Sequence, residues 1–113
     1  MKDDLPLFLH WTKFLKWLLP KTGKFPKDVR FTFASRIDNL ALDVLENVIE
    51  AAYSREKRPC LRRASMAIEK LRVLLRICHE LGYLDHRGYE HAAERLDEAG
   101  RMTGGWLKQQ AAR

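Results

Sequence analysis

Apolar side chains recur along this chain with the spacing of α-helices. The longest pattern starts at Ile37, from which apolar residues follow at +3, +4, +7, +8, +11, +12 and +15. This 3.6-residue period is typical of an amphipathic helix with one face in a core. Pro26 suits the first turn of such a helix, where its missing amide costs nothing. The pattern therefore predicts one helix over residues 26–53, about 40 Å long at the α-helical rise.

Two further helices are predicted toward the C-terminus. After a polar connection at residues 54–59, apolar residues repeat with helical spacing from Leu61 to Cys78, and Gly82 provides a stop. Asp85 is then a suitable N-cap for the last helix, the fourth in the chain, whose apolar face extends to Leu107.

The fourth helix contains Gly100, Gly104 and Gly105, each of which costs a helix roughly 1 kcal/mol relative to alanine. Because the apolar face continues beyond these glycines, they predict the close approach of another helix rather than a frayed end. Such an approach would leave Trp106 free to dock against that neighbour.

The first helix is predicted over residues 5–19 and ends at Pro20, which lacks an amide donor and clashes with the preceding turn. Its apolar positions extend beyond one stripe, because Leu7, Trp11 and Phe14 lie on another side of the helix than the main apolar face. A helix that is apolar on most of its circumference is buried on more than one side. In so small a chain, this predicts a homo-oligomer whose interface contains Leu7, Trp11 and Phe14.

These helices and their short connections predict the fold class. No stretch alternates apolar and polar residues over more than a few positions, and short loops between long helices favour antiparallel neighbours. We therefore expect an all-α protein with an up-and-down antiparallel four-helix bundle. The 113 residues suffice for one domain, 1–113, and 46% apolar with 32% charged residues is an ordinary globular balance.

Charged residues alternate in blocks along the chain. The net charge is +6, with 21 Lys and Arg against 15 Asp and Glu. Residues 13–36 and 55–76 each carry a surplus of six positive charges, whereas residues 37–54 and 77–100 each carry a surplus of four negative charges. Two interpretations stay open: the bases contact the phosphate backbone of a nucleic acid, or they pair with acidic side chains within the bundle or between subunits.

The third predicted helix carries the densest cluster of bases. Arg72 and Arg76 lie one turn apart, where they can follow a phosphate backbone or pair with Glu69 and Glu80. As a set, the cluster favours nucleic-acid binding. The candidate binding residues are Arg62, Arg63, Lys70, Arg72 and Arg76, together with Lys24, Lys27 and Arg30 of the first basic block.

Aromatic residues are few among these bases. Phe25, Phe31 and Phe33 lie in the first basic block, but we expect their rings in the core. Base stacking on exposed rings, a common device of proteins that bind single strands, is therefore not expected.

Catalytic and cofactor-binding patterns are missing from the sequence. None of the four histidines has the Glu-x-x-His spacing of a di-iron bundle, and His86 and His91 are five residues apart, a poor fit to one helical face. The sequence also lacks a glycine-rich phosphate loop after a strand and a nucleophile elbow. We expect a protein that is not an enzyme and binds no metal or cofactor.

The remaining features favour a soluble cytoplasmic protein. Cys60 and Cys78 form no C-x-x-C motif and are expected to be free thiols in a reducing compartment. The first apolar stretch is interrupted by charged residues and is shorter than the ~20 residues of a membrane span. No segment resembles a secretory signal, so no membrane partner is expected.

Several segments resemble the accessory variability determinant (Avd) proteins of diversity-generating retroelements. The more specific ones are the Phe-Pro-Lys run at 25–27 and the Gly-Arg-Met-Thr-Gly-Gly-Trp run at 100–106. The likeness covers residues 8–109. Less specific segments that fit the same family lie at 14–17, 30–31, 36–37, 71–76 and 89–91.

The resemblance implies a four-helix bundle assembled into a ring-like homopentamer, with a basic surface that binds RNA or DNA. Such proteins associate with the retroelement's reverse transcriptase and assist synthesis of mutagenic cDNA from a template RNA. Arg72 and Arg76 fall where the family pattern has bases, so the binding role is carried over onto them. A related family, encoded in intervening sequences of 23S ribosomal RNA genes, shares the bundle and offers the alternative of an oligomeric protein-binding scaffold.

Overall fold

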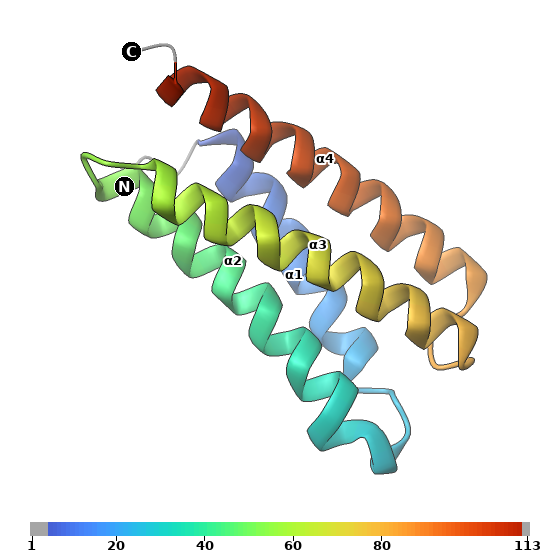
Figure 1. Ribbon diagram of the computed structural model, residues 1–113. Coiled ribbons are helices and arrows are strands. Elements are labelled where there is room, and N and C mark those ends of the chain that lie inside the picture. Colours follow the sequence, from blue (N-terminus) through green and yellow to red (C-terminus); the bar gives the residue numbers. More distant parts are fainter. Residues whose placement is uncertain (1–4, 112–113) are drawn as a thin grey trace.

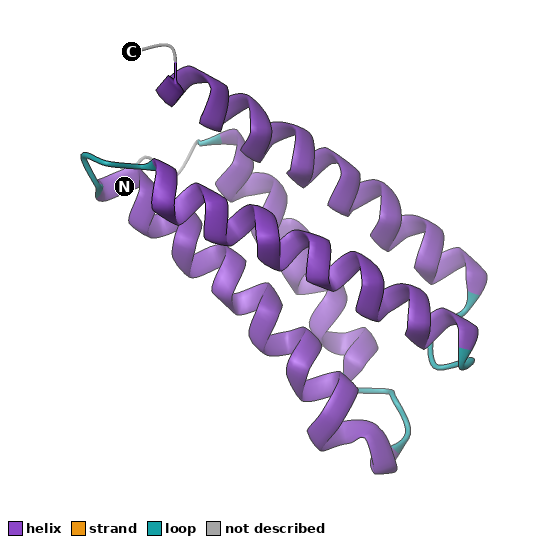
Figure 2. Cartoon of the chain, in the orientation of Figure 1, coloured by secondary structure: helices purple, strands orange, loops and turns teal. Residues whose placement is uncertain are grey.

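The computed structural model describes residues 5–111, and the chain within these residues consists of helices and short connections without strands (Figure 2). Long helices run alternately up and down, each packs against the next, and α4 also packs against α1 (Figure 1). This arrangement confirms the predicted all-α bundle of four helices, whereas the ring-like assembly stays a prediction. In chain order the elements are α1 (Pro6–Thr22), a 3₁₀ turn η1 (Lys27–Val29), a π-helical turn η2 (Arg30–Ala34), α2 (Ser35–Tyr53), α3 (Arg58–Glu80) and α4 (His86–Ala111).

Apolar side chains cover more than one side of α1 because this helix packs against two other helices of the same chain. Leu7, Trp11 and Phe14 are only 3%, 0% and 1% exposed, because α1 lies between α2 and α4 and buries a side against each. The indole Nε1 of Trp11 donates to the carbonyl oxygen of Ala41 in α2 at 2.8 Å. The prediction that these three side chains form a subunit interface is therefore wrong: their surface is already used in the core of the bundle.

The end of α1 also differs from the prediction. Pro20 does not stop the helix, which continues to Thr22. Pro20 and Lys16 are both exposed, so water can bind the Lys16 carbonyl that Pro20 leaves without an amide donor. The hydroxyl of Thr22 then donates to Asp38 Oδ1 at 2.6 Å and ties the last turn of α1 to α2.

The helix predicted over 26–53 is divided into three parts. Pro26 precedes the 3₁₀ turn, and the π-helical turn follows before α2 begins at Ser35. A π-helix bonds residues five apart, so Val29 and Ala34 both face the core, at 8% and 7% exposure. The wider turn therefore buries two apolar side chains that a continuous α-helix would place on different faces.

The predicted signals at the other helix ends are confirmed. Gly82 follows α3 with a φ of 82°, a conformation that side chains other than glycine rarely adopt. Asp85 caps α4, since its Oδ1 accepts the backbone amide of Gly88 at 2.7 Å. The end of α2 is closed by a contact that was not predicted: Lys57 Nζ donates to the carbonyls of Ala51 and Ser54 at 2.7 and 2.8 Å.

The glycines of α4 fit the close-approach prediction only at Gly100, where a Cβ atom would lie 3.2 Å from Nη2 of Arg72. A Cβ atom at Gly104 or Gly105 would meet nothing within 4 Å, so the prediction is wrong there. Trp106 is half-buried and packs against a small cluster with Leu61 of α3.

The two cysteines are free, as expected, and both are buried. Burial raises the pKa of the Cys78 thiol to about 11. Among the helices of residues 5–111, none combines the length and apolarity needed to cross a membrane.

Candidate nucleic-acid interface

The eight basic residues proposed from the sequence are spread over two regions of the bundle. Those of α3 follow its length, from Arg62 at one end of the bundle to Arg76 near the other. Lys24, Lys27 and Arg30 lie at the Arg76 end, in the segment that connects α1 to α2. Which of the eight are available to a ligand depends on their ion pairs.

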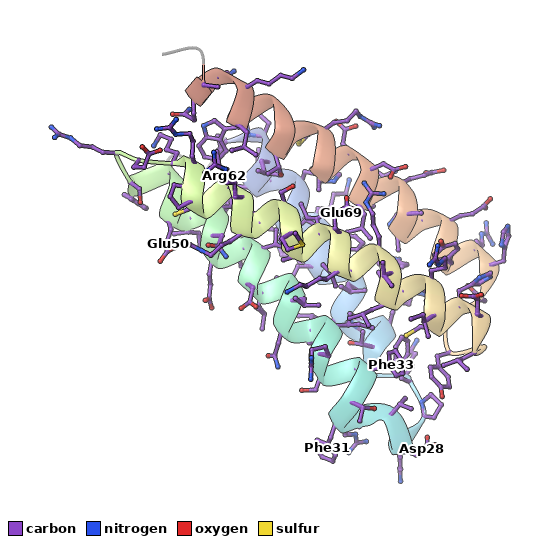
Figure 3. The ribbon with its side chains drawn as sticks, viewed as in Figure 1. Asp28, Phe31, Phe33, Glu50, Arg62 and Glu69 are labelled. Atoms are coloured by element: carbon purple, nitrogen blue, oxygen red, sulfur yellow. The ribbon has the colours of Figure 1, made fainter. Side chains whose placement is uncertain are left out.

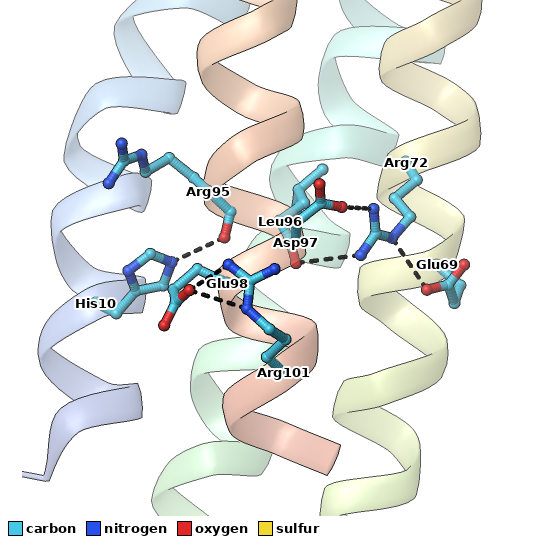
Figure 4. A network of polar contacts seen from close by, with 8 residues as sticks. All are labelled: His10, Glu69, Arg72, Arg95, Leu96, Asp97, Glu98 and Arg101. Atoms are coloured by element: carbon cyan, nitrogen blue, oxygen red, sulfur yellow. Dashed lines mark hydrogen bonds and ion pairs between the residues drawn. The ribbon is translucent and has the colours of Figure 1, made fainter. Parts of the chain in front are cut away.

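Arg72 is held by neighbouring groups of the bundle. Its Nε donates to Glu69 Oε1 at 3.0 Å, one turn earlier on α3, and its Nη1 donates to Asp97 on α4. Its Nη2 donates to the carbonyl oxygen of Leu96 at 3.4 Å (Figure 4). The hydrogen bond with Asp97 raises the pKa of Arg72 above its ordinary value. Arg72 therefore links α3 to α4 instead of presenting a free charge.

Replacing Arg72 by alanine is expected to lower the free energy of unfolding by about 1 kcal/mol, because the bridge between α3 and α4 is lost. Arg76→Ala is the matched control, since Arg76 lies one turn further on α3 and forms no ion pair with any residue in 5–111. Its effect should stay within about 0.5 kcal/mol. Urea unfolding measures both, and equal destabilisation by the two variants would contradict the bridging role.

Two more arginines at the start of α3 are paired. Arg63 donates from Nε to Asn47 Oδ1 at 2.9 Å and from Nη2 to Glu50 Oε2 at 3.2 Å, both on α2. Arg58 donates to the Glu56 carboxylate from Nε and Nη2, both at 2.9 Å, and from its backbone amide at 3.2 Å, and these hydrogen bonds hold the pKa of Glu56 at about 2. The pairing interpretation thus applies to Arg63 and Arg72 among the candidates.

The other bases of α3 are spread along the helix and lie on different sides of it. Arg62, Lys70 and Arg76 are exposed and have no ion pair within residues 5–111. They span 14 residues, which corresponds to about 21 Å along the helix. We call these three residues the α3 row. Figure 3 shows Arg62 at the start of α3, with Glu69 further along the same helix.

A second group of unpaired bases lies at the end of the bundle. Lys24, Lys27, Arg30 and Arg36 are exposed, and the described part of the chain offers none of them an ion pair. We call these four residues the end cluster. The turn that carries them is fixed from inside, because the Phe25 ring packs 5.9 Å from that of Tyr83 in the α3–α4 connection.

Two adjoining hollows connect Arg36 of the end cluster with Lys70 of the α3 row. The larger, about 520 Å³, lies between α2 and α3 and has apolar walls with Arg36 and Lys70 among its lining residues. The smaller, about 250 Å³, lies beside Phe31 and shares Arg36 and Leu74 with the larger one. Arg36 and Lys70 therefore share a concave surface that runs from the α1–α2 connection onto α3, whereas Arg76 lines a separate hollow between α3 and α4.

Sequence reasoning missed two residues of this surface. Arg36 was recognisable only as a member of the first basic block, and its position between the hollows depends on how α2 packs on α3. Phe31 was expected in the core but is 85% exposed, whereas Phe25 is buried and Phe33 half-buried. The π-helical turn, which has no simple sequence signal, turns Phe31 outward.

The acidic neighbours of the surface are few. Asp28 is exposed in the same turn as Lys27, and Glu69 lines the larger hollow but is bonded by Arg72. Within the described residues, no group of three or more His, Cys, Asp or Glu side chains could hold a metal ion. The arrangement is suited to binding an extended polyanion.

The sequence model of a protein family described as bAvd-like matches residues 8–110. The chain belongs to the bAvd-like family. The match includes all four long helices, the end cluster and the α3 row, and it confirms the resemblance seen in the Phe-Pro-Lys and Gly-Arg-Met segments. No curated protein matches the chain. Membership of the bAvd-like family suggests an accessory role in diversity-generating retroelements.

Proposed function

We propose that this bAvd-like protein is a non-enzymatic subunit that binds nucleic acid and assists a reverse transcriptase in mutagenic cDNA synthesis from a template RNA. The observation that carries the binding role is the set of seven exposed bases, the α3 row and the end cluster, that lack ion pairs within residues 5–111. Each exposed base without an ion pair can release a counterion from a phosphate backbone when the complex forms.

The proposed assembly is a ring-like homo-oligomer, with five subunits implied by the family resemblance. Leu7, Trp11 and Phe14 do not supply its interface, so the contact falls on surfaces that the single chain leaves open. Exposed apolar side chains outside the hollow between α2 and α3 are available for such contacts, including Leu9 of α1 and Leu42 of α2. Association with the reverse transcriptase is part of the same proposal and rests on the family alone.

The first test is the light-scattering mass of the purified protein, alone and mixed with a generic RNA, across a salt series. We expect a defined oligomer that binds RNA or DNA with little sequence preference at low salt and releases it as salt rises. For single strands, the logarithm of the binding constant should fall by about 0.7 per neutralised phosphate for each tenfold rise in salt. An oligomer that ignores RNA at every salt concentration would contradict the proposal and support a protein-binding scaffold.

A further inference from the structure

Among the large apolar side chains of residues 5–111, Phe31 is the most exposed, with 85% of its surface open to solvent. Figure 3 shows it pointing away from the helices at the end of the bundle, while Phe33 lies on the side of the α3–α4 connection. The core does not require Phe31, because Val29 and Ala34 fix the turn from inside and the ring of Phe33 packs against Tyr83. The ring is thus held out on an anchored turn without an apolar role in the chain.

The surroundings of Phe31 are cationic and concave. The end cluster surrounds it along the chain, with Lys27 and Arg30 before it and Arg36 after it, and Asp28 is the one acid between Lys27 and Arg36. The ring also lines the smaller hollow, about 250 Å³, together with Phe33, Leu74 and the guanidinium-bearing Arg36. An apolar, uncharged partner would leave these charges unmatched, whereas a polyanion with flat apolar faces matches both the charges and the ring.

An unpaired nucleotide has this chemistry. Its base can stack on an aromatic ring, and its phosphates can contact flanking Lys and Arg side chains. A duplex covers the faces of its bases and offers only phosphates. We infer that Phe31 is a stacking platform for the nucleobase of an unpaired nucleotide, and that Lys27, Arg30 and Arg36 hold the phosphates on either side of that nucleobase.

The path of the strand beyond Phe31 follows from the hollows. Arg36 and Leu74 line both hollows, and the larger one leads between α2 and α3 to Lys70 of the α3 row. A single strand stacked on Phe31 therefore continues past Arg36 to Lys70, between α2 and α3. This inference rests on the proposed nucleic-acid binding and adds to it a preference for single strands.

The test compares the binding of a fluorescein-labelled oligouridine with that of an RNA duplex of the same length, at one low salt concentration. Wild-type protein should prefer the single strand. Phe31→Ala should weaken oligouridine binding about tenfold and leave duplex binding unchanged. Phe31→Trp keeps a stacking surface and should retain the wild-type preference. Tyr53→Ala, which removes another exposed aromatic ring at the opposite end of α2, is the matched control and should change neither affinity.

The outcomes separate this inference from the proposed function. If the wild type binds neither ligand, the proposed function itself is wrong. If it binds both ligands and Phe31→Ala leaves the single-strand preference intact, the stacking platform is wrong and backbone binding stands. Equal weakening of oligouridine and duplex binding by Phe31→Ala would also overturn the inference. So would a Phe31→Ala protein that binds oligouridine like the wild type but has a smaller light-scattering mass, since Phe31 would then be a contact between subunits.

Discussion

Replacing Trp11 by alanine is expected to lower the free energy of unfolding by about 3–5 kcal/mol, the usual cost of deleting a large buried ring. Trp11 is fully buried, its ring lies 5.1 Å from that of Phe14, and its indole bonds the carbonyl of Ala41. The variant therefore loses the packing of α1 on α2 and leaves a cavity in the core. Since small domains have total stabilities of about 5–15 kcal/mol, the loss should be evident in urea or thermal unfolding.

Trp11→Phe is the matched control for this variant. It keeps most of the apolar volume and removes the indole donor, so the expected loss is smaller, about 1 kcal/mol for the hydrogen bond plus a small packing defect. Both variants should retain the oligomeric state of the wild type at temperatures where they are folded. A Trp11→Ala protein that unfolds like the wild type but dissociates into monomers would contradict the core role of Trp11. It would support a contact of Trp11 with another subunit instead.

Neutralising the α3 row with Arg62→Ala, Lys70→Ala and Arg76→Ala together is expected to weaken RNA binding by about 100-fold at low salt. Each of the three bases lacks an ion pair within residues 5–111, so each is free to neutralise one phosphate. The salt dependence should decrease at the same time, by about 2 in the slope of the logarithm of the binding constant for a single strand. Fluorescence anisotropy at several salt concentrations measures both quantities.

A second triple variant separates local contacts from net charge. Lys13→Ala, Lys16→Ala and Lys108→Ala together also lower the net charge by three, but at exposed positions of α1 and α4. If the α3 row contacts the nucleic acid, this control should lose far less affinity and keep most of the wild-type salt slope. Equal losses in the two triple variants would mean that RNA responds to the overall charge of the protein, and the α3 row would then have no special place in the site.

The sequence predicts the helices of this fold because each carries its own periodic pattern and end signals. Asp85 and Gly82 act locally, within a few residues, and their roles were therefore recognisable. The effect of Pro20 on α1 was misjudged, because this proline removes only one backbone hydrogen bond, at an exposed position near the end of the helix. The π-helical turn escaped prediction because it depends on Val29 and Ala34 facing the core together, which no 3.6-residue pattern describes.

The candidate site was less predictable because it depends on which helices become neighbours. Arg72 was grouped with Arg76 by spacing alone, yet its partner Asp97 lies 25 residues away on α4. The same difficulty applies to Trp11, since a broadly apolar helix looks alike whether its second side meets another subunit or another helix of its own chain. Local charge blocks located the basic region, and tertiary packing decided which bases stayed free.

The even number of long helices returns the chain to the end of the bundle where it started. Leu5 and Pro6 at the start of α1 line one hollow together with Trp106 and Gln109 near the end of α4. Figure 1 shows the start of α1 and the end of α4 at the same end of the bundle. Phe31 and the end cluster lie at the far end. An affinity handle or fluorophore attached beside Pro6 or Gln109 therefore leaves Phe31 and the end cluster unobstructed, and one reporter at each of these two positions would register a change in the packing of α1 on α4.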